Sequence, residues 1–418
     1  MRKEYEGIYD WNLHQGPSEP VKSPQLKVEI DDETWRDGMQ GTQFEEDEDQ
    51  PTLEEKDKYI YHVASRDYVD HLDIGFPATS QLHRNEIVSL IDSSTKRKER
   101  LTFSVAGRAA AIDDARAIVE IAERSNVPLE ADVFWDPSKI RSKVQGWNRE
   151  EMMIRTSKNI EFLKKEGLSV MYVPERASAT PPEELYEICM IAADSGADRL
   201  AIADTTGVLT PQGTVNIFRE VFSKIGNKYP HIKFDFHEHD DLGMGLANSL
   251  VAAQEGVDRL HATARSVGER AGNVSLEKLI VLLNLRGFRD IDTKEIIQFA
   301  HLASDILKVA HPTSHEPIIG ENWPETSSGV HANTYGKMGD TPIYFPFDPK
   351  EVGLEPKVKI GATSGLSNVY LYCESLGILN LTEEKALEVL NFAHSTGRQL
   401  SENTVRKIVG RNGQPHDH

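Results

Sequence analysis

The sequence predicts a (β/α)₈ TIM barrel followed by a smaller, mainly helical C-terminal region. Eight short runs rich in Val, Ile, Leu and Phe recur through the first two-thirds of the 418 residues, with helical patterns between them. Strands that alternate with helices in this way form βα units and a parallel sheet, and eight such units make a barrel of about 250 residues. The runs are Leu26–Ile30, Val69–Ile74, Leu101–Val105, Leu129–Phe134, Leu168–Val173, Arg199–Asp204, Ile232–His237 and Asp258–Thr263.

Helix signals fill the intervals between these runs. After the first run, Thr52 and Glu55 have the spacing of a capping box at the start of a helical pattern. After the third run, residues 113–126 carry apolar side chains at helical period and end in Asn126. After the fifth run, a pattern opens with two prolines and ends at Gly196. Because no glycine-rich phosphate fingerprint follows the first run, we expect a closed barrel rather than an open doubly wound sheet.

Polar and reactive side chains follow the ends of the runs. In a barrel, the loops after the strands open onto one mouth, and the active sites of this fold lie there. We therefore expect these side chains to share one site. They are Arg36 and Asp37 after the first run, Arg108 after the third, Ser138 and Arg141 after the fourth, Glu175 after the fifth, Asp204 and Thr205 at the sixth, His237 and His239 at the seventh, and Glu269 and Asn273 after the eighth.

The predicted domain organisation places the barrel between two other regions. An N-terminal extension covers residues 1–25, and the catalytic barrel covers residues 26–290. A linker and lid-like subdomain is expected over residues 291–345. A helical C-terminal subdomain is expected over residues 346–418.

The composition limits the partners and the compartment. With 47 basic and 67 acidic residues, the net charge of −20 disfavours nucleic acids and membranes as partners. The basic run Lys96–Arg100 is expected to complement a helix C-terminus. The two cysteines, Cys189 and Cys373, favour neither a disulfide framework nor a thiolate metal site. Neither a signal-type apolar stretch nor an apolar run of about 18 residues occurs, so we expect a cytoplasmic protein.

The stretch FDFHEHDDLG, Phe234 to Gly243, crowds two histidines at the end of a strand-like run. Residues i and i+2 of a strand point to one face, so His237 and His239 point together. They could be a polar pair on a solvated strand end. Asp37 can join them, because the first, seventh and eighth strands are neighbours in a closed barrel. One carboxylate and two neutral imidazoles suit a divalent cation, and the set leaves Mg²⁺, Mn²⁺ and Zn²⁺ open.

Several longer motifs resemble those of the 2-isopropylmalate synthase and homocitrate synthase family, the metal-dependent acyl-CoA condensing enzymes and lyases built on a TIM barrel. The resemblance covers residues 26–283 closely and continues more loosely through residues 317–332 and 344–365. It rests on DETWRDGMQ, LDIGFPATS, ADTTGVLTP, HEHDDLGMGLANSLVAA and SVGERAGNVSLE, in that order along the chain. It implies a Claisen-type condensation of acetyl-CoA with a 2-oxo acid that is bound to a divalent metal.

The resemblance also implies roles for individual residues. Asp37, His237 and His239 match the metal ligands, and Asn273 matches a position that ligates or supports the metal. The expected catalytic residues are Arg36, which would stabilise the developing oxyanion, Glu175, and His331, which resembles a histidine delivered into the partner subunit's site and so implies a homodimer. The expected substrate-binding residues are Gln40, Arg108, Ser138, Arg141 and Thr205.

Three departures from the family pattern put the acceptor acid in doubt. Asp73 stands where relatives usually have Glu, Asp240 where many have Asn, and Arg141 where a histidine is usual. Arg141 is expected to favour an additional or displaced acidic group on the 2-oxo acid. A 2-isopropylmalate synthase-like reaction is the first expectation, with homocitrate or citramalate synthase-like activity as alternatives.

Other function classes stay open on the sequence. A hydroxymethylglutaryl-CoA lyase would carry a cysteine in the loop after the eighth strand, where this chain reads ARSVGERAGN. A metal-dependent aldolase would share Arg36, Asp37 and the histidines but would need no CoA. A catalytically silent binding module would have no reason to keep a bound metal.

Overall fold

The computed structural model describes Tyr9, His14, Pro17, Ser18 and residues 27–41, 50–338 and 344–410. Apart from those first four residues, the predicted N-terminal extension lies outside the described part of the chain. Contacts divide the chain into two compact units. The first runs to Ile291 and includes Gln298–His311, and the second comprises Asp292–Ile297 and the chain from Pro312 onward.

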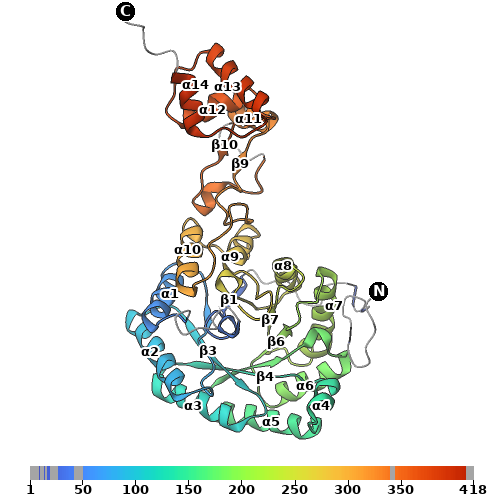
Figure 1. The fold of residues 1–418 in the computed structure, drawn as a ribbon. Coiled ribbons are helices and arrows are strands. Elements are labelled where there is room, and N and C mark those ends of the chain that lie inside the picture. Colours follow the sequence, from blue (N-terminus) through green and yellow to red (C-terminus); the bar gives the residue numbers. More distant parts are fainter. Residues whose placement is uncertain are drawn as a thin grey trace, which may run out of the picture. The chain divides into compact units, whose positions relative to one another are not determined.

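The first unit is a closed barrel of eight parallel strands in the order β1 to β8, which confirms the predicted TIM barrel (Figure 1). Closure comes from β8, whose Arg259–Ala262 pairs with Glu29–Asp32 of β1. Every predicted run overlaps a strand. The strands are β1 (Glu29–Asp32), β2 (His71–Asp73), β3 (Thr102–Arg108), β4 (Leu129–Trp135), β5 (Ser169–Pro174), β6 (Arg199–Asp204), β7 (Lys233–Glu238) and β8 (Arg259–Ala262).

Helices form the outer ring of the barrel (Figure 1). The predicted capping box is present at Thr52 and Glu55, and Asn126 ends its helix in the left-handed conformation. Lys96 and Arg97 lie in the last turn of α2, where cations complement the helix dipole. The helices up to residue 307 are α1 (Leu53–Ser65), α2 (Gln81–Arg97), α3 (Ile112–Ser125), α4 (Lys139–Gln145), α5 (Arg149–Lys165), α6 (Pro182–Asp194), α7 (Pro211–Val221), α8 (Gly245–Glu255), α9 (Leu276–Leu285) and α10 (Ile296–Leu307).

The apolar core of the barrel lies between the strands and the helices. Successive strand residues alternate between two faces, and the outward face of the strands is apolar and buried. Its members include Ile30, Leu72, Val105, Val133, Val170, Leu200, Phe236 and Leu260. This layer accounts for the apolar runs by which the strands are recognised in the sequence.

The interior of the barrel is polar. The parallel register, followed around the closed barrel, places inward side chains in layers of four from alternate strands, as in other TIM barrels. Branched apolar residues usually dominate such layers, but here charged and polar side chains do. From the N-terminal end upward the layers are His71, Glu130, Arg199 and Arg259; then Asp31, Ser104, Met171 and Asp235; then Asp73, Asp132, Ala201 and His261; then Glu33, Ala106, Val173 and His237.

The second unit has its own small core. A two-stranded parallel sheet pairs β9 (Glu325–Thr326) with β10 (Lys357–Val358). An apolar cluster that includes Val369, Cys373 and Val389 holds the later helices together. Within the described residues of both units, no helix combines the length and apolar character needed to cross a bilayer. The helices of this unit are α11 (Gly329–Met338), α12 (Leu366–Ser375), α13 (Glu383–Thr396) and α14 (Glu402–Gly410).

Candidate active site and metal centre

A cavity of about 360 Å³ opens at the C-terminal ends of the barrel strands, the end at which TIM-barrel enzymes bind their substrates. A larger hollow of about 580 Å³, near Lys27 and Arg289, lies beside the opposite strand ends and contains none of the predicted site residues. Nine predicted residues line the smaller cavity, and we take it as the site. Its lining comprises Arg36, Asp37, Gln40, Ala106, Asp132, Phe134, Arg141, Val173, Glu175, Ala203, Thr205, His237, His239, Glu269 and Arg270.

Arg36 lies in the turn after β1 and donates to three carboxylates. Its Nε is 2.7 Å from Oδ2 of Asp73, its Nη1 is 2.6 Å from Oδ1 of Asp37, and its Nη2 is 2.6 Å from Oε1 of Glu33. Burial alone would lower the pKa of Arg36, but the three carboxylates raise it well above its ordinary value. A guanidinium fixed in this way can stabilise negative charge on an oxygen bound in the cavity.

Asp37, His237 and His239 converge as the sequence predicts, with their ligand atoms all within 4.8 Å of one another. Nδ1 of His237 lies 2.5 Å from Oε2 of Glu33, which leaves Nε2 available for a ligand. Burial, and then the neighbouring His237, lower the pKa of His239 to about 4. The His239 imidazole is therefore neutral near pH 7, the form that binds metal ions.

Two buried polar atoms at this centre fit a bound cation. Nδ1 of His239 and Oδ1 of Asn273 have no hydrogen-bond partner among the described residues. The amide nitrogen of Asn273 donates to Oδ2 of Asp37 at 2.9 Å and to the carbonyl of Val267 at 3.0 Å. Asn273 thus orients Asp37, and its amide oxygen is buried without a partner among the described residues. Carboxylate, imidazole and amide donors suit Mg²⁺, Mn²⁺ or Zn²⁺.

Glu175 and Thr205 line the cavity from the loops after β5 and β6. Burial, followed by the carboxylate of Asp136, raises the pKa of Glu175. The hydroxyl of Thr205 accepts a hydrogen bond from the backbone N–H of Arg176 at 2.9 Å, and this bond ties the two loops together. Gln40 is exposed at the rim of the same cavity.

Two predicted substrate-binding residues lie outside the cavity lining. Ser138 is fully buried at the N-terminus of α4, where its hydroxyl lies 2.6 Å from Oδ1 of Asp136 and accepts from the backbone N–H of Arg141 at 3.3 Å. Arg108 is 63% exposed, and both its Nε and its Nη2 lie 2.8 Å from the carboxylate of Asp114. Both side chains thus have structural partners.

His331 belongs to the second unit, on α11. Its Nδ1 is 3.2 Å from the hydroxyl of Thr326, and its ring stacks on Tyr344 with centroids 3.8 Å apart. These neighbours all belong to the second unit.

A family model described as HMGL-like matches residues 27–303, more than half of the chain. The chain belongs to the HMGL-like family. This result confirms the resemblance to 2-isopropylmalate and homocitrate synthases that the motifs indicate.

Curated relatives of this HMGL-like protein carry synthase names. A 2-isopropylmalate synthase of Sulfurisphaera tokodaii is 30% identical over 368 residues, which cover 87% of this chain and 89% of the relative. A probable 2-isopropylmalate synthase of Methanopyrus kandleri is 29% identical over 377 residues, 89% of this chain and 70% of the relative. A homocitrate synthase of Sulfurisphaera tokodaii is 29% identical over 357 residues, 84% and 73% of the two chains.

Solved structures support the fold of the HMGL-like protein. The hydroxymethylglutaryl-CoA lyase of Pseudomonas aeruginosa superposes with a TM-score of 0.57 at 18% identity, covering 69% of this chain and 96% of the lyase. At this identity the similarity establishes the barrel fold alone.

Some residues of the site are not among those predicted from the sequence. Glu33 bonds Arg36 and His237 at once, and Asp132 lines the cavity from β4. Burial and then the carboxylates of Asp73 and Glu130 raise the pKa of Asp132 well above its ordinary value. For Asp132 the available signal is the alternation of acidic and apolar residues in Leu129–Phe134, because alternation marks two different strand faces. Glu33 follows two other acidic residues, so no such alternation marks it.

We expect His239→Ala to lower the affinity of the site for divalent metal by at least about 10–100-fold, the loss typical even of residues that only support a ligand. The substitution removes one of three ligands and leaves Asp37 and His237 in place. Metal content after equilibrium dialysis against Mn²⁺ measures the effect. His231→Ala, at an exposed histidine before β7, is the matched control and should keep the wild-type content. Equal content in His239→Ala would contradict the ligand assignment.

Proposed function

We propose that this HMGL-like protein joins the methyl carbon of acetyl-CoA to the keto carbon of a 2-oxo acid, a Claisen-type condensation of the 2-isopropylmalate synthase kind. The products are a 2-hydroxy-2-(carboxymethyl) acid and CoA, so the enzyme is an acyltransferase. The observation that carries the proposal is the convergence of Arg36, Asp37, His237 and His239 on one cavity. Relatives named 2-isopropylmalate, citramalate and homocitrate synthase support this reaction class.

Six residues of the site have a role in the proposed reaction. Asp37, His237 and His239, with Asn273 in support, would hold a divalent cation, which would supply Lewis-acid polarisation of the keto group. Arg36 stabilises the oxyanion that develops on the keto oxygen. Glu175, whose pKa is raised by burial, suits a general base for the methyl proton. As the carbon–carbon bond forms, the keto oxygen gains a proton, and water then cleaves the thioester to give a carboxylate and the CoA thiol.

The remaining roles belong to the same proposal. Gln40 and Thr205 contact the acceptor acid from the cavity wall. Arg108 and Ser138, which pair with Asp114 and Asp136 outside the lining, support the loops around the cavity. His331 enters the active site of the partner subunit in a homodimer. The reaction serves leucine biosynthesis in the cytoplasm. Light scattering on the purified protein tests the dimer, and a monomeric mass with full activity would contradict the role of His331.

The test of the function is CoA release from acetyl-CoA, followed with a thiol reagent across a panel of 2-oxo acids with Mg²⁺ or Mn²⁺. We expect release that depends on one or a few oxo acids and on the metal. The control is the same assay without an oxo acid. If no acid supports release while the protein binds metal, the condensing reaction is wrong, and cleavage by an aldolase or lyase is the reaction to assay.

Arg141 favours a second candidate, a homocitrate synthase-like reaction on an acceptor with an additional carboxylate. The side chain lines the cavity, its Nε is buried, and the described residues give that atom no hydrogen-bond partner and the guanidinium no ion pair. The nearest ring is that of Trp147, 5.9 Å from the guanidinium carbon. By contrast, the cavity-lining guanidiniums of Arg36 and Arg270 are paired with carboxylates. A guanidinium that lines the cavity without an ion pair is suited to bind an anionic group of the substrate.

We expect Arg141→His to change the ranking of acceptor acids. Hydrogen bonds to charged groups contribute about 1.5–3 kcal/mol, which corresponds to roughly 10–150-fold in kcat/KM at 1.4 kcal/mol per decade. The loss should fall on 2-oxo acids with a second carboxylate and spare the monocarboxylic ones. The measurement is kcat/KM across the panel, with Arg141→Lys as a variant that keeps the charge. An unchanged ranking in Arg141→His would exclude the role.

A further inference from the structure

The barrel interior contains a second group of potential metal ligands, below the candidate centre. Asp31, His71 and Asp132 each offer an atom, and these atoms all lie within 4.8 Å of one another. All three side chains are at least 96% buried. Both carboxylate oxygens of Asp31, both of Asp132 and Nε2 of His71 have no hydrogen-bond partner among the described residues. The hydroxyl of Ser104, in the same layer as Asp31, is also buried and unbonded.

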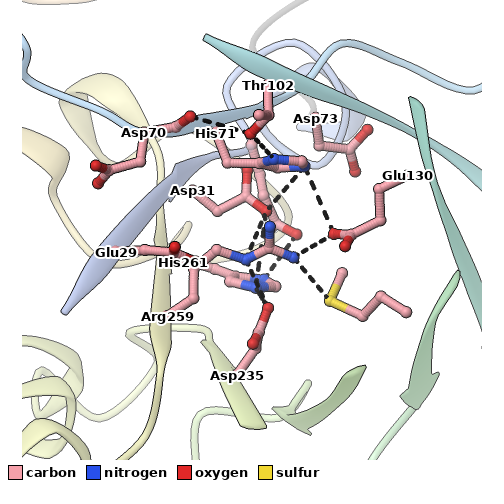
Figure 2. A network of polar contacts seen from close by, with 12 residues as sticks. Glu29, Asp31, Asp70, His71, Asp73, Thr102, Glu130, Asp235, Arg259 and His261 are labelled. Carbon is pink, nitrogen blue, oxygen red and sulfur yellow. Dashed lines mark hydrogen bonds and ion pairs between the residues drawn. The ribbon is translucent and has the colours of Figure 1, made fainter. Parts of the chain in front are cut away.

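The hydrogen bonds around His71 fix the direction of its lone pair. The hydroxyl of Thr102 donates to the backbone carbonyl of Asp70 at 3.1 Å and lies 2.6 Å from Nδ1 of His71 (Figure 2). Because that hydroxyl proton is used, Nδ1 carries the ring proton and donates to Thr102. Nε2 therefore presents its lone pair to the interior. An imidazole oriented by a hydrogen bond through its other nitrogen is the usual arrangement of a metal-binding histidine.

The lone pair of His71 faces negative oxygens. Nε2 lies 3.6 Å from Oε1 of Glu130 and 4.0 Å from Oδ2 of Asp31. Figure 2 shows His71, Asp31 and Glu130 around the guanidinium of Arg259. The nearest cationic atom to Asp31 is Nε of Arg259, at 3.6 Å, and that guanidinium also bonds Asp235 and Glu130. Acceptors that face one another in a buried space require a cation or protons between them.

The balance of charged groups in the barrel interior also favours a bound cation. The interior contains seven buried carboxyl groups and three guanidinium groups. The imidazole of His261, if protonated, adds a fourth cation. If every one of these carboxyls is ionised, one divalent cation at the candidate centre leaves one negative charge in excess. Either a further cation or a proton must balance it, because burial raises the pKa of Asp31 to about 7 and that of Asp132 well above its ordinary value. The acids are Asp31, Glu33, Asp37, Asp73, Glu130, Asp132 and Asp235, and the cations are Arg36, Arg199, Arg259 and His261.

We propose that Asp31, His71 and Asp132 bind a second divalent cation inside the barrel, separate from the centre at Asp37. Two carboxylates and one imidazole form a mixed oxygen and nitrogen set that suits Mn²⁺, Mg²⁺ or Zn²⁺. Asp132 also lines the cavity at the barrel mouth, so the proposed site adjoins that cavity. The ion offsets buried negative charge and holds β1, β2 and β4 together, which makes the site structural.

Metal analysis of the full-length protein after dialysis against Mn²⁺ tests the proposal without reference to activity. We expect two equivalents per wild-type chain, one in His71→Ala and one in the matched variant His239→Ala, which removes a ligand of the other centre. The double variant should bind none. A single equivalent in the wild type, with the same content in His71→Ala, would overturn the second site. It would leave the condensing function untouched.

Two further measurements apply if His71→Ala does not fold. Thr102→Val removes only the hydroxyl that orients His71, and we expect it to weaken the interior site by about 10–100-fold while the first site keeps its affinity. Anomalous scattering from wild-type crystals grown with Mn²⁺ should give two peaks, one among Asp31, His71 and Asp132. Water density at that place, with one peak at the barrel mouth, would show a hydrated, protonated cluster and overturn the proposal.

Discussion

Arg36→Lys is expected to lower kcat for CoA release by about 10²–10³-fold, the cost typical of losing one donor to a developing oxyanion. Lysine keeps the positive charge, but it lacks the planar fork that reaches Glu33, Asp37 and Asp73 together. At least one of these buried carboxylates loses its partner, and the charge no longer has a fixed position. Steady-state kinetics with saturating acetyl-CoA measures the effect.

Two controls separate this chemical effect from damage to the fold. Arg116→Lys makes the same replacement at an exposed arginine that pairs with Asp113, and it should leave kcat unchanged. Metal content of Arg36→Lys, measured at saturating Mn²⁺, should reach the wild-type level because all three predicted ligands are present, although the loss of the bond to Asp37 can weaken the affinity. A kcat within about threefold of wild type would remove Arg36 from the catalytic group.

Arg259→Met is expected to lower the free energy of unfolding of the barrel by about 3–5 kcal/mol. This is the usual cost of removing one partner of a buried ion pair while the other stays buried. The guanidinium of Arg259 is 2% exposed. Its Nε donates to Asp235 at 2.6 Å, and its Nη2 bonds Glu130. Methionine matches the stem of the side chain but leaves Glu130 without its guanidinium partner, while Asp235 keeps only Arg199 as a guanidinium partner.

Urea denaturation, read from the transition that reports the barrel, measures this loss. Arg124→Met is the control, because it breaks a partly exposed helix pair with Glu120. Such surface pairs contribute about 0–1 kcal/mol, so the control should unfold near the wild-type midpoint. If Arg259→Met lost no more than Arg124→Met, the interior network would not stabilise the barrel.

The strands and the metal centre are the parts of this structure that the sequence predicts well. Each strand has an apolar outward face, and this face produces the runs by which all eight strands are found. Asp37, His237 and His239 are brought together by strand order alone, since β1 and β7 both pair with β8. A closed barrel therefore requires this convergence once the strands are assigned.

The parts of the site that the sequence predicts less well depend on the direction of side chains rather than on the order of strands. Ser138 follows β4 as a substrate residue would, but whether its hydroxyl turns to a ligand or caps α4 is decided by one side-chain torsion. Glu33 bonds His237, 204 positions away along the chain, and no local pattern encodes that pairing. The role proposed for His331 requires a second subunit, whereas its neighbours in the described chain are Thr326 and Tyr344.

The polar layers inside the barrel change how this protein can accept mutations. An apolar core tolerates exchanges that preserve volume, so its positions vary almost independently of one another. In this interior, replacing a single acid or base removes one member of the ion-pair network that joins Arg259, Asp235 and Glu130 (Figure 2). The charge balance of the remaining members then changes. We therefore expect substitutions at the inward positions of β1, β2, β4, β7 and β8 to be epistatic. The interior can be redesigned in charge-matched pairs, such as Arg199 with Asp235, far more readily than one residue at a time.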